Sequence, residues 1–193
     1  ALLRPLGIHV RRIEPPRLEP RPEAVVEITN LLINEGIGDY VVLHPGGGGS
    51  AEKWPPGHYR ELAGIFARKG LGVVVSGGEG ERVEADEITA GLDAPRADLA
   101  GRTDLELLAA LIAGTRLFVS SSTGPMHLAA ALGVPQAAIF SNRPPNDPAR
   151  WRPLNRRASV FTPPGPDDGL EAIRPNLVAR ALDEGYHLET RPD

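Results

Sequence analysis

The chain has 193 residues, of which 41% are hydrophobic and 24% are charged, and its formal net charge is −4. This composition suits one globular domain with a buried core. The chain has no cysteine, which excludes disulfides and thiolate metal sites. Its acidic balance argues against a general nucleic-acid binder, and no apolar run is long enough to span a membrane.

Residues 1–22 are rich in proline and arginine and show no regular period, which predicts an extended interdomain linker. Apolar residues then recur at helical spacing, which predicts a helix over 23–36 that ends at Gly36. From residue 40 onward, short apolar strands alternate with helical segments. We expect strands at 40–44, 72–76, 98–100, 117–120, 136–140 and 159–162, and helices at 58–69, 81–90, 104–114, 125–132, 148–151 and 170–184.

This alternation predicts an α/β fold, with a Rossmann-like, doubly wound parallel sheet in a domain of residues 23–193. Sheets of this kind bind ligands beyond the carboxyl ends of their strands, near the point where the strand order reverses. We therefore expect a site in the loops that follow the strands.

The stretch 116–133, RLFVSSSTGPMHLAAALG, predicts a buried strand that passes through small hydroxyl residues into a helix. Unpaired backbone N–H groups and the positive end of a helix dipole would meet there, which favours an anion and most often a phosphate. His127 lies in the first helical turn, within reach of such a ligand. An ordinary strand-to-helix turn capped by Ser or Thr explains the same pattern.

Two other loops are rich in glycine. Four glycines follow the strand at 40–44, and Lys53 beyond them would bring a positive charge to a phosphate; the alternative is a flexible surface loop. The loop after 72–76 contains Glu79 and Glu81. A carboxylate there can accept two hydrogen bonds from a ribose, or it can simply favour the first turn of the next helix.

Other notable residues predict structure rather than chemistry. Trp54 is expected to pack in the core, and Asp104 is expected to cap the helix over 104–114. No Ser-His-Asp set is identifiable, and the histidines are too scattered for a metal site, so we expect no bound metal. The proline-rich loop over 141–148 either closes over a site or crosses the surface.

Taken in order, HPGGGGSAEKWP, SGGEGE and LAGRTDLELLAALIAGTRLFVSSSTGPMHLAAALGVP resemble the heptosyltransferase-like glycosyltransferases of family 9. The resemblance spans residues 40–155. It implies the two-domain GT-B fold, in which the C-terminal half binds the nucleotide sugar and the N-terminal half binds the acceptor. This chain looks like the C-terminal half alone, beginning in the linker, with the acceptor half absent.

The resemblance also implies which residues contact the donor. The glycine loop and its lysine would approach the diphosphate, Glu81 would hold the ribose, and Thr103 would lie beside the base. The family signature D-[ST]-G-x-x-H, which faces the diphosphate and sugar, is matched at Thr123, Gly124 and His127. The expected donor contacts are Gly48, Gly49, Lys53, Glu81, Thr103, Ser122, Thr123, Gly124 and His127.

Two positions depart from the family pattern. Ser122 stands where the signature has an aspartate, so the site lacks that charge on the sugar side. The family's lysine usually stands two residues before the tryptophan, where this chain has Glu52, and Lys53 comes one residue later. Lys53 reaches the phosphate only if the loop shifts by one residue.

The resemblance implies a glycosyltransferase that moves a heptose-like sugar from a nucleoside-diphosphate sugar, most simply ADP-linked, to lipopolysaccharide or another glycan. Transfer would be a direct displacement with inversion, without a cofactor, and the missing half would supply the base; His127 is the one catalytic candidate here. A degenerate nucleotide-binding scaffold module and a relative that uses a UDP-sugar stay open as alternatives. The expected location is cytoplasmic, with peripheral association with the inner membrane face as one option.

Overall fold

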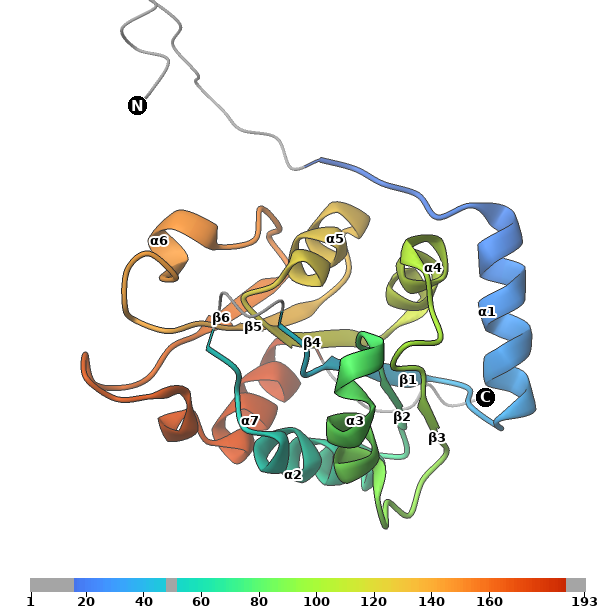
Figure 1. The fold of residues 1–193 in the computed structure, drawn as a ribbon, viewed down its shortest axis with the longest axis horizontal. Helices are drawn as coiled ribbons and strands as arrows, with labels where there is room; N and C mark the ends of the chain where they lie inside the picture. Colours follow the sequence, from blue (N-terminus) through green and yellow to red (C-terminus); the bar gives the residue numbers. More distant parts are fainter. Residues whose placement is uncertain (1–15, 48–51, 187–193) are drawn as a thin grey trace, which may run out of the picture.

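The computed structural model describes residues 16–47 and 52–186, which form a parallel sheet between two layers of helices (Figure 1). The strands are β1 Tyr40–His44, β2 Gly72–Val75, β3 Arg96–Asp98, β4 Leu117–Ser121, β5 Gln136–Ile139 and β6 Ala158–Phe161. Their order is β3-β2-β1-β4-β5-β6, and all neighbouring strands are parallel. The predicted doubly wound, Rossmann-like sheet is confirmed, and the strand order reverses between β1 and β4.

Helices cover both faces of the sheet. They are α1 Pro22–Asn34, α2 Pro56–Ala67, α3 Arg82–Thr89, α4 Leu105–Gly114, α5 Gly124–Leu132, α6 Pro148–Trp151 and α7 Pro175–Tyr186, with 3₁₀ turns η2 Glu79–Glu81 and η3 Leu170–Ala172. Helices α1, α4 and α5 pack on one face, and α2, α3 and α7 pack on the other.

The core is divided by the sheet because successive strand side chains point to opposite faces. In β1, Val41 and Leu43 pack with the α2 and α7 layer, whereas Val42 packs with the α1 and α4 layer. All three side chains are fully buried. This two-sided burial explains why β1 is a continuous apolar run rather than an alternating one.

Several predicted elements are shifted by up to two residues: the helix expected over 58–69 is α2 Pro56–Ala67, which starts at its proline, and the helix expected over 23–36 is α1 Pro22–Asn34. Two other elements differ for a reason that a single residue supplies. The strand expected at 98–100 lies at Arg96–Asp98, because the Asp98 side chain accepts a hydrogen bond from the Ala100 N–H (2.8 Å) and turns the chain. The helix expected over 170–184 is interrupted, and α7 begins at Pro175. Proline has no N–H and disfavours helical backbone in the residue before it, so the turn η3 cannot continue into α7.

Candidate functional site

A cleft of about 650 Å³ lies at the carboxyl edge of the sheet, where the strand order reverses. Its described lining comes from the loops after β1, β2 and β4, and consists of His44, Gly47, Lys53, Gly78, Gly80, Glu81, Thr123, Gly124 and Pro125. The fold therefore brings together four of the predicted donor contacts, Lys53, Glu81, Thr123 and Gly124, from three separate loops.

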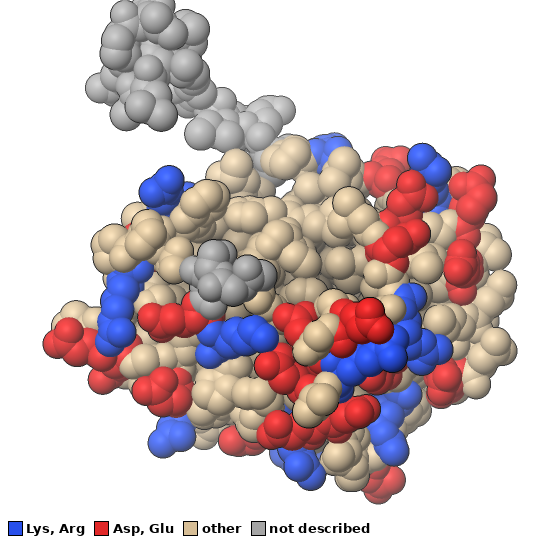
Figure 2. Space-filling view, in the orientation of Figure 1, with Lys and Arg blue, Asp and Glu red and all other residues tan. Residues whose placement is uncertain are grey.

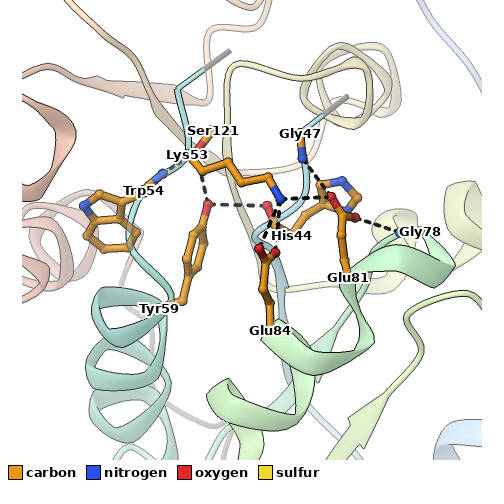
Figure 3. Close-up of polar contacts among 9 residues, drawn as sticks. All are labelled: His44, Gly47, Lys53, Trp54, Tyr59, Gly78, Glu81, Glu84 and Ser121. Carbon is orange, nitrogen blue, oxygen red and sulfur yellow. Dashed lines mark hydrogen bonds and ion pairs between the residues drawn. The ribbon is translucent and has the colours of Figure 1, made fainter. Parts of the chain in front are cut away.

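Glu81 joins two of these loops (Figure 3). One carboxylate oxygen accepts a hydrogen bond from the Gly47 N–H (2.9 Å), and the other accepts one from the Gly78 N–H (2.8 Å). Burial by itself would raise the pKa of Glu81, but the hydrogen bonds from Gly78 and Gly47, together with nearby positive charge, lower it below its usual value. The carboxylate is thus held ionised at the floor of the cleft.

Gly46 and Gly77 lie so close to Glu81 that no larger residue fits at either position. A β-carbon at Gly46 would collide with the Glu81 carboxylate, and one at Gly77 would lie 2.9 Å from it. The absence of side chains at Gly46 and Gly77 leaves room for the Glu81 carboxylate.

Lys53 is held by two carboxylates. Its Nζ lies 3.2 Å from both oxygens of Glu84 and 3.6 Å from Oε1 of Glu81. The lysine side chain is 38% exposed, and ion pairs at such exposure contribute little to stability. An anion that enters the cleft can therefore recruit Lys53 at small cost.

Thr123 ends the loop after β4, immediately before α5 begins at Gly124. Its backbone is extended, but its side chain does not cap the helix, and its Oγ1 is buried without a hydrogen-bond partner among the described residues. The first N–H groups of a helix have no partner within the helix. The cleft thus ends on a helix N-terminus flanked by a hydroxyl that still needs a partner.

His44, which the sequence did not single out as a site residue, forms part of the cleft floor. Its Nδ1 lies 3.0 Å from the Ser76 hydroxyl, and only 7% of the residue is exposed. Burial lowers the pKa of His44 to about 4, so the ring is neutral at ordinary pH. Ser120 pairs with His44 across β1 and β4, and its buried hydroxyl has no partner among the described residues.

A sequence signal for His44 exists, because it is a polar residue at the carboxyl end of an otherwise apolar strand, directly before a glycine loop. In a parallel sheet such a position faces the ligand edge. The scattered spacing of the histidines hides this signal when they are compared only with metal motifs.

The other predicted contacts lie outside the cleft lining. Thr103 is half-buried just before α4, Ser122 is half-buried after β4, and His127 is exposed on the first turn of α5. The His127 ring faces Trp151, with 6.4 Å between ring centroids. Gly48 and Gly49 lie outside the described residues.

Trp54 anchors the chain next to Lys53. Its ring is fully buried, its backbone N–H donates to the Ser121 hydroxyl (3.2 Å), and its indole N–H donates to the Ile173 carbonyl (3.0 Å). The predicted packing role of Trp54 is confirmed. Asp104 is also confirmed as a cap, since its carboxylate accepts from the Leu107 N–H (2.8 Å).

The loop over 141–148 packs against the loop that follows β6 and contributes nothing to the described cleft lining. The Asn142 amide donates to the Pro163 carbonyl (2.8 Å), and the Arg143 guanidinium donates to the Asp167 carbonyl (2.6 Å). Residues 16–47 and 52–186 contain no cluster of three acidic or histidine side chains able to hold a metal. None of the helices in that part of the chain is long and apolar enough to cross a membrane.

The reversed strand order, the cleft at the reversal and the helix N-terminus beside it define a doubly wound α/β protein whose cleft lies where such folds bind their ligands. Residues 28–167 match glycosyltransferase family 9 (heptosyltransferase), and the chain belongs to this family.

Three relatives show how far the similarity extends. Lipooligosaccharide heptosyltransferase 2 of Haemophilus ducreyi is 34% identical over 154 residues, which cover 75% of this chain and 42% of that protein. The structure of E. coli ADP-heptose LPS heptosyltransferase II matches with a TM-score of 0.78 and 26% identity, over 93% of this chain and 56% of that one. E. coli heptosyltransferase WaaC with ADP matches with a TM-score of 0.68 and 27% identity, over 77% of this chain and 44% of that one. The chain spans about half the length of these relatives.

Proposed function

We propose that this chain is the donor-binding half of a glycosyltransferase with a GT-B fold. It binds a nucleoside-diphosphate sugar, ADP-linked and heptose-like, for transfer to lipopolysaccharide or another glycan. The observation that carries the proposal is the cleft at the strand-order reversal, which gathers the Glu81 carboxylate, the Lys53 ammonium and the start of α5. The relative crystallised with ADP supports the choice of nucleotide.

The chemistry of the cleft complements each part of such a donor. Ribose hydroxyls need acceptors, and Glu81 keeps free lone pairs after its two backbone hydrogen bonds. A diphosphate needs N–H donors and positive charge, which the N-terminus of α5 and Lys53 supply. The buried Thr123 hydroxyl gains the hydrogen bond that it lacks in the described structure.

In this proposal the N–H groups at the start of α5 and the Lys53 ammonium also assist transfer of the sugar. When the bond from the sugar to the diphosphate breaks, negative charge grows on the departing phosphate oxygen. Donors already aimed at that position stabilise the charge without reorganisation. In this proposal the base that deprotonates the acceptor hydroxyl belongs to the acceptor half, and His127 stays the one catalytic candidate of this chain.

Calorimetric titration of this chain with ADP and with UDP tests the proposal. We expect ADP to bind more tightly than UDP, and Thr123→Val to weaken ADP about ten-fold, since the change removes a hydroxyl that the ligand would satisfy. Thr162→Val is the matched control, because Thr162 is exposed and remote from the cleft lining. Failure of the chain to bind either nucleotide would refute the donor-binding role, and a preference for UDP would favour the UDP-sugar alternative.

The second candidate function is a scaffold module that has kept the fold and lost transfer, and Ser122 in place of an acid favours it. Ser122→Asp in a protein joined to an acceptor half distinguishes the two. A higher rate of sugar transfer in Ser122→Asp would show that the chain is an enzyme whose activity is reduced by Ser122. Unchanged transfer together with the absence of nucleotide binding would show the scaffold module.

A further inference from the structure

A basic and apolar surface lies along α5, outside the cleft lining, and has no part in the function proposed above. The segment 150–157, RWRPLNRR, contains four exposed arginines together with Trp151 and Leu154, which are 42% and 48% exposed. Arg17 is also exposed, and Leu18 is 52% exposed. We call the exposed side chains of 150–157, with Arg17 and Leu18, the arginine patch.

The two segments of the arginine patch form one surface along α5. The Trp151 ring faces His127 in the first turn of this helix, and the Leu18 N–H donates to the Ala131 carbonyl in its last turn (3.0 Å). Residues 16–19 and 155–157 line a common groove of about 660 Å³ with the end of α5. His127 and Ala131 are four residues apart and so lie on the same side of the helix. Figure 1 shows α6 and the segment before α1 beside α5.

The charge of the arginine patch is not neutralised within the described structure. It contains five arginines, and none of them forms an ion pair with an acidic side chain of residues 16–47 or 52–186. The nearby acids are Glu19 and Asp147, and the Asp147 carboxylate already caps α6 by accepting from the Ala149 N–H (2.9 Å). Figure 2 shows mostly tan atoms with some blue ones over α5 and α6, whereas red atoms gather beside α1 and red and blue atoms are intermixed over α3.

Trp151, the aromatic residue of the patch, makes two contacts within the protein and is still 42% exposed. The indole N–H of Trp151 donates to the Pro145 carbonyl (2.9 Å), and the Arg150 guanidinium lies 5.1 Å from the ring centroid. The polar edge of the ring is therefore satisfied by the protein. An apolar face stays available beside a cation, which is the chemistry favoured at a membrane–water interface.

We propose that the arginine patch docks this protein on an anionic lipid bilayer. Guanidinium groups form paired hydrogen bonds with lipid phosphates, and Trp151, Leu154 and Leu18 can enter the apolar layer directly beneath them. A free phosphate would engage the arginines alone, and a single-stranded nucleic acid would engage the arginines and Trp151, but neither would use the exposed Leu18 and Leu154. The interleaving of exposed apolar side chains with arginines on a protein of net charge −4 therefore favours a lipid surface.

Vesicle sedimentation of this chain tests the proposal, with phosphatidylcholine vesicles that contain or lack phosphatidylglycerol. We expect binding only to the anionic vesicles, and weaker binding as salt is raised. The chain has two tryptophans, and Trp54 is fully buried, so a blue shift of the fluorescence on binding reports Trp151. Trp151→Phe should abolish that shift.

Arg156→Gln with Arg157→Gln should weaken vesicle binding about 25-fold, from about five-fold for each arginine. The matched control is Arg68→Gln with Arg180→Gln, which removes the same charge from the α2 and α7 layer on the other face of the sheet. The control should bind like the unmodified chain. Three results would each overturn the proposal. The first is an equal loss of vesicle affinity in the two double variants, and the second is binding to neutral vesicles. The third is binding to DNA without a blue shift of Trp151 fluorescence on vesicles. Unchanged ADP titration in both variants shows that the cleft is intact.

Discussion

Glu81 is the residue on which the arrangement of the cleft depends, because its carboxylate accepts from both glycine loops. Glu81→Gln replaces one acceptor oxygen by an N–H₂ group, so one loop N–H would face another donor. We expect the variant to lose about 1–2 kcal/mol of unfolding free energy in a denaturant titration. We also expect it to bind ADP about ten-fold more weakly by calorimetry.

Glu84→Gln is the control for this prediction, because Glu84 contacts Lys53 (3.2 Å) and neither glycine loop. The pair is partly exposed, so its loss should change stability by less than about 1 kcal/mol. ADP binding should stay within about two-fold, since Lys53 remains beside Glu81. If the two variants lost the same affinity, Glu81 would act through cleft charge and not by joining the loops.

His44 should make stability depend on pH. Its pKa is lowered by burial from 6.5 to about 4, so the unfolded chain takes up a proton below pH 6.5 that the folded protein excludes. The stabilisation is therefore complete above pH 6.5 and is lost as the pH falls toward 4, by up to about 3 kcal/mol. His44→Asn keeps a polar group beside Ser76 but cannot take up a proton, so it should flatten this decline.

Denaturant titrations between pH 6.5 and pH 4 measure the effect. His58→Gln is the control, since the pKa of His58 is also lowered, by burial and by Arg174, but this ring is only half-buried. Its variant should change the pH slope less than His44→Asn does. Glu81, whose pKa is lowered from 4.5, adds a loss that begins only as the pH falls below about 4.5. An unchanged slope in His44→Asn would show that the buried ring does not control acid stability.

At the scale of elements, α5 is defined by its two ends. It begins beside the cleft after Thr123, and it stops at Gly133, whose φ of 71° is left-handed. A β-carbon at Gly133 would meet nothing within 4 Å, so substitution there costs conformational energy alone. We expect Gly133→Ala to lower the unfolding free energy by about 1 kcal/mol in a denaturant titration, while ADP affinity stays unchanged.

Gly57→Ala is the matched control for the end of α5. Gly57 lies in the first turn of α2 with ordinary backbone angles, and a β-carbon there also meets nothing within 4 Å. Alanine favours helix, so no loss of stability is expected. A loss at Gly57 equal to that at Gly133 would contradict the assignment of the cost to left-handed backbone.

At the scale of the whole molecule, the described lining of the cleft offers groups that complement a nucleotide but contains no free base. Its titratable side chains are His44, Lys53 and Glu81, and each already has a partner. A neutral imidazole with a pKa of about 4 is a weak base at neutral pH. We expect this chain to bind ADP and to transfer no sugar until an acceptor half is supplied, as followed by release of ADP from an ADP-sugar. Turnover by this chain alone would contradict the proposed division of labour.

Nucleotide binding should also raise the melting temperature, because a ligand that binds only the folded state stabilises it by mass action. With ADP at about a hundred times its Kd, the expected gain is about 2.7 kcal/mol. This measurement separates a folded chain that does not bind from a chain that does not fold.

The local pattern of apolar residues was sufficient to predict the type and approximate position of most helices and strands. The strand at 40–44 is two-sided and apolar, and the structure confirms its bounds. Two of the errors arose where one side chain or one proline overrode the pattern, at Asp98 and at Pro175. The hydrogen bond of an aspartate to its own chain cannot be read from the period of apolar residues, so the position of β3 was wrong by two residues.

The sequence by itself determined the α/β class, the family resemblance and the loops in which a site should lie, because these follow from local period and motif. Only the tertiary structure decided that Glu81 joins two loops, that His44 lies on the cleft floor, and that Arg17 and Arg157 share one surface. The physical reason is that strand order sets which loops become neighbours. Contacts between residues far apart in the chain depend on that order and on nothing that a local pattern contains.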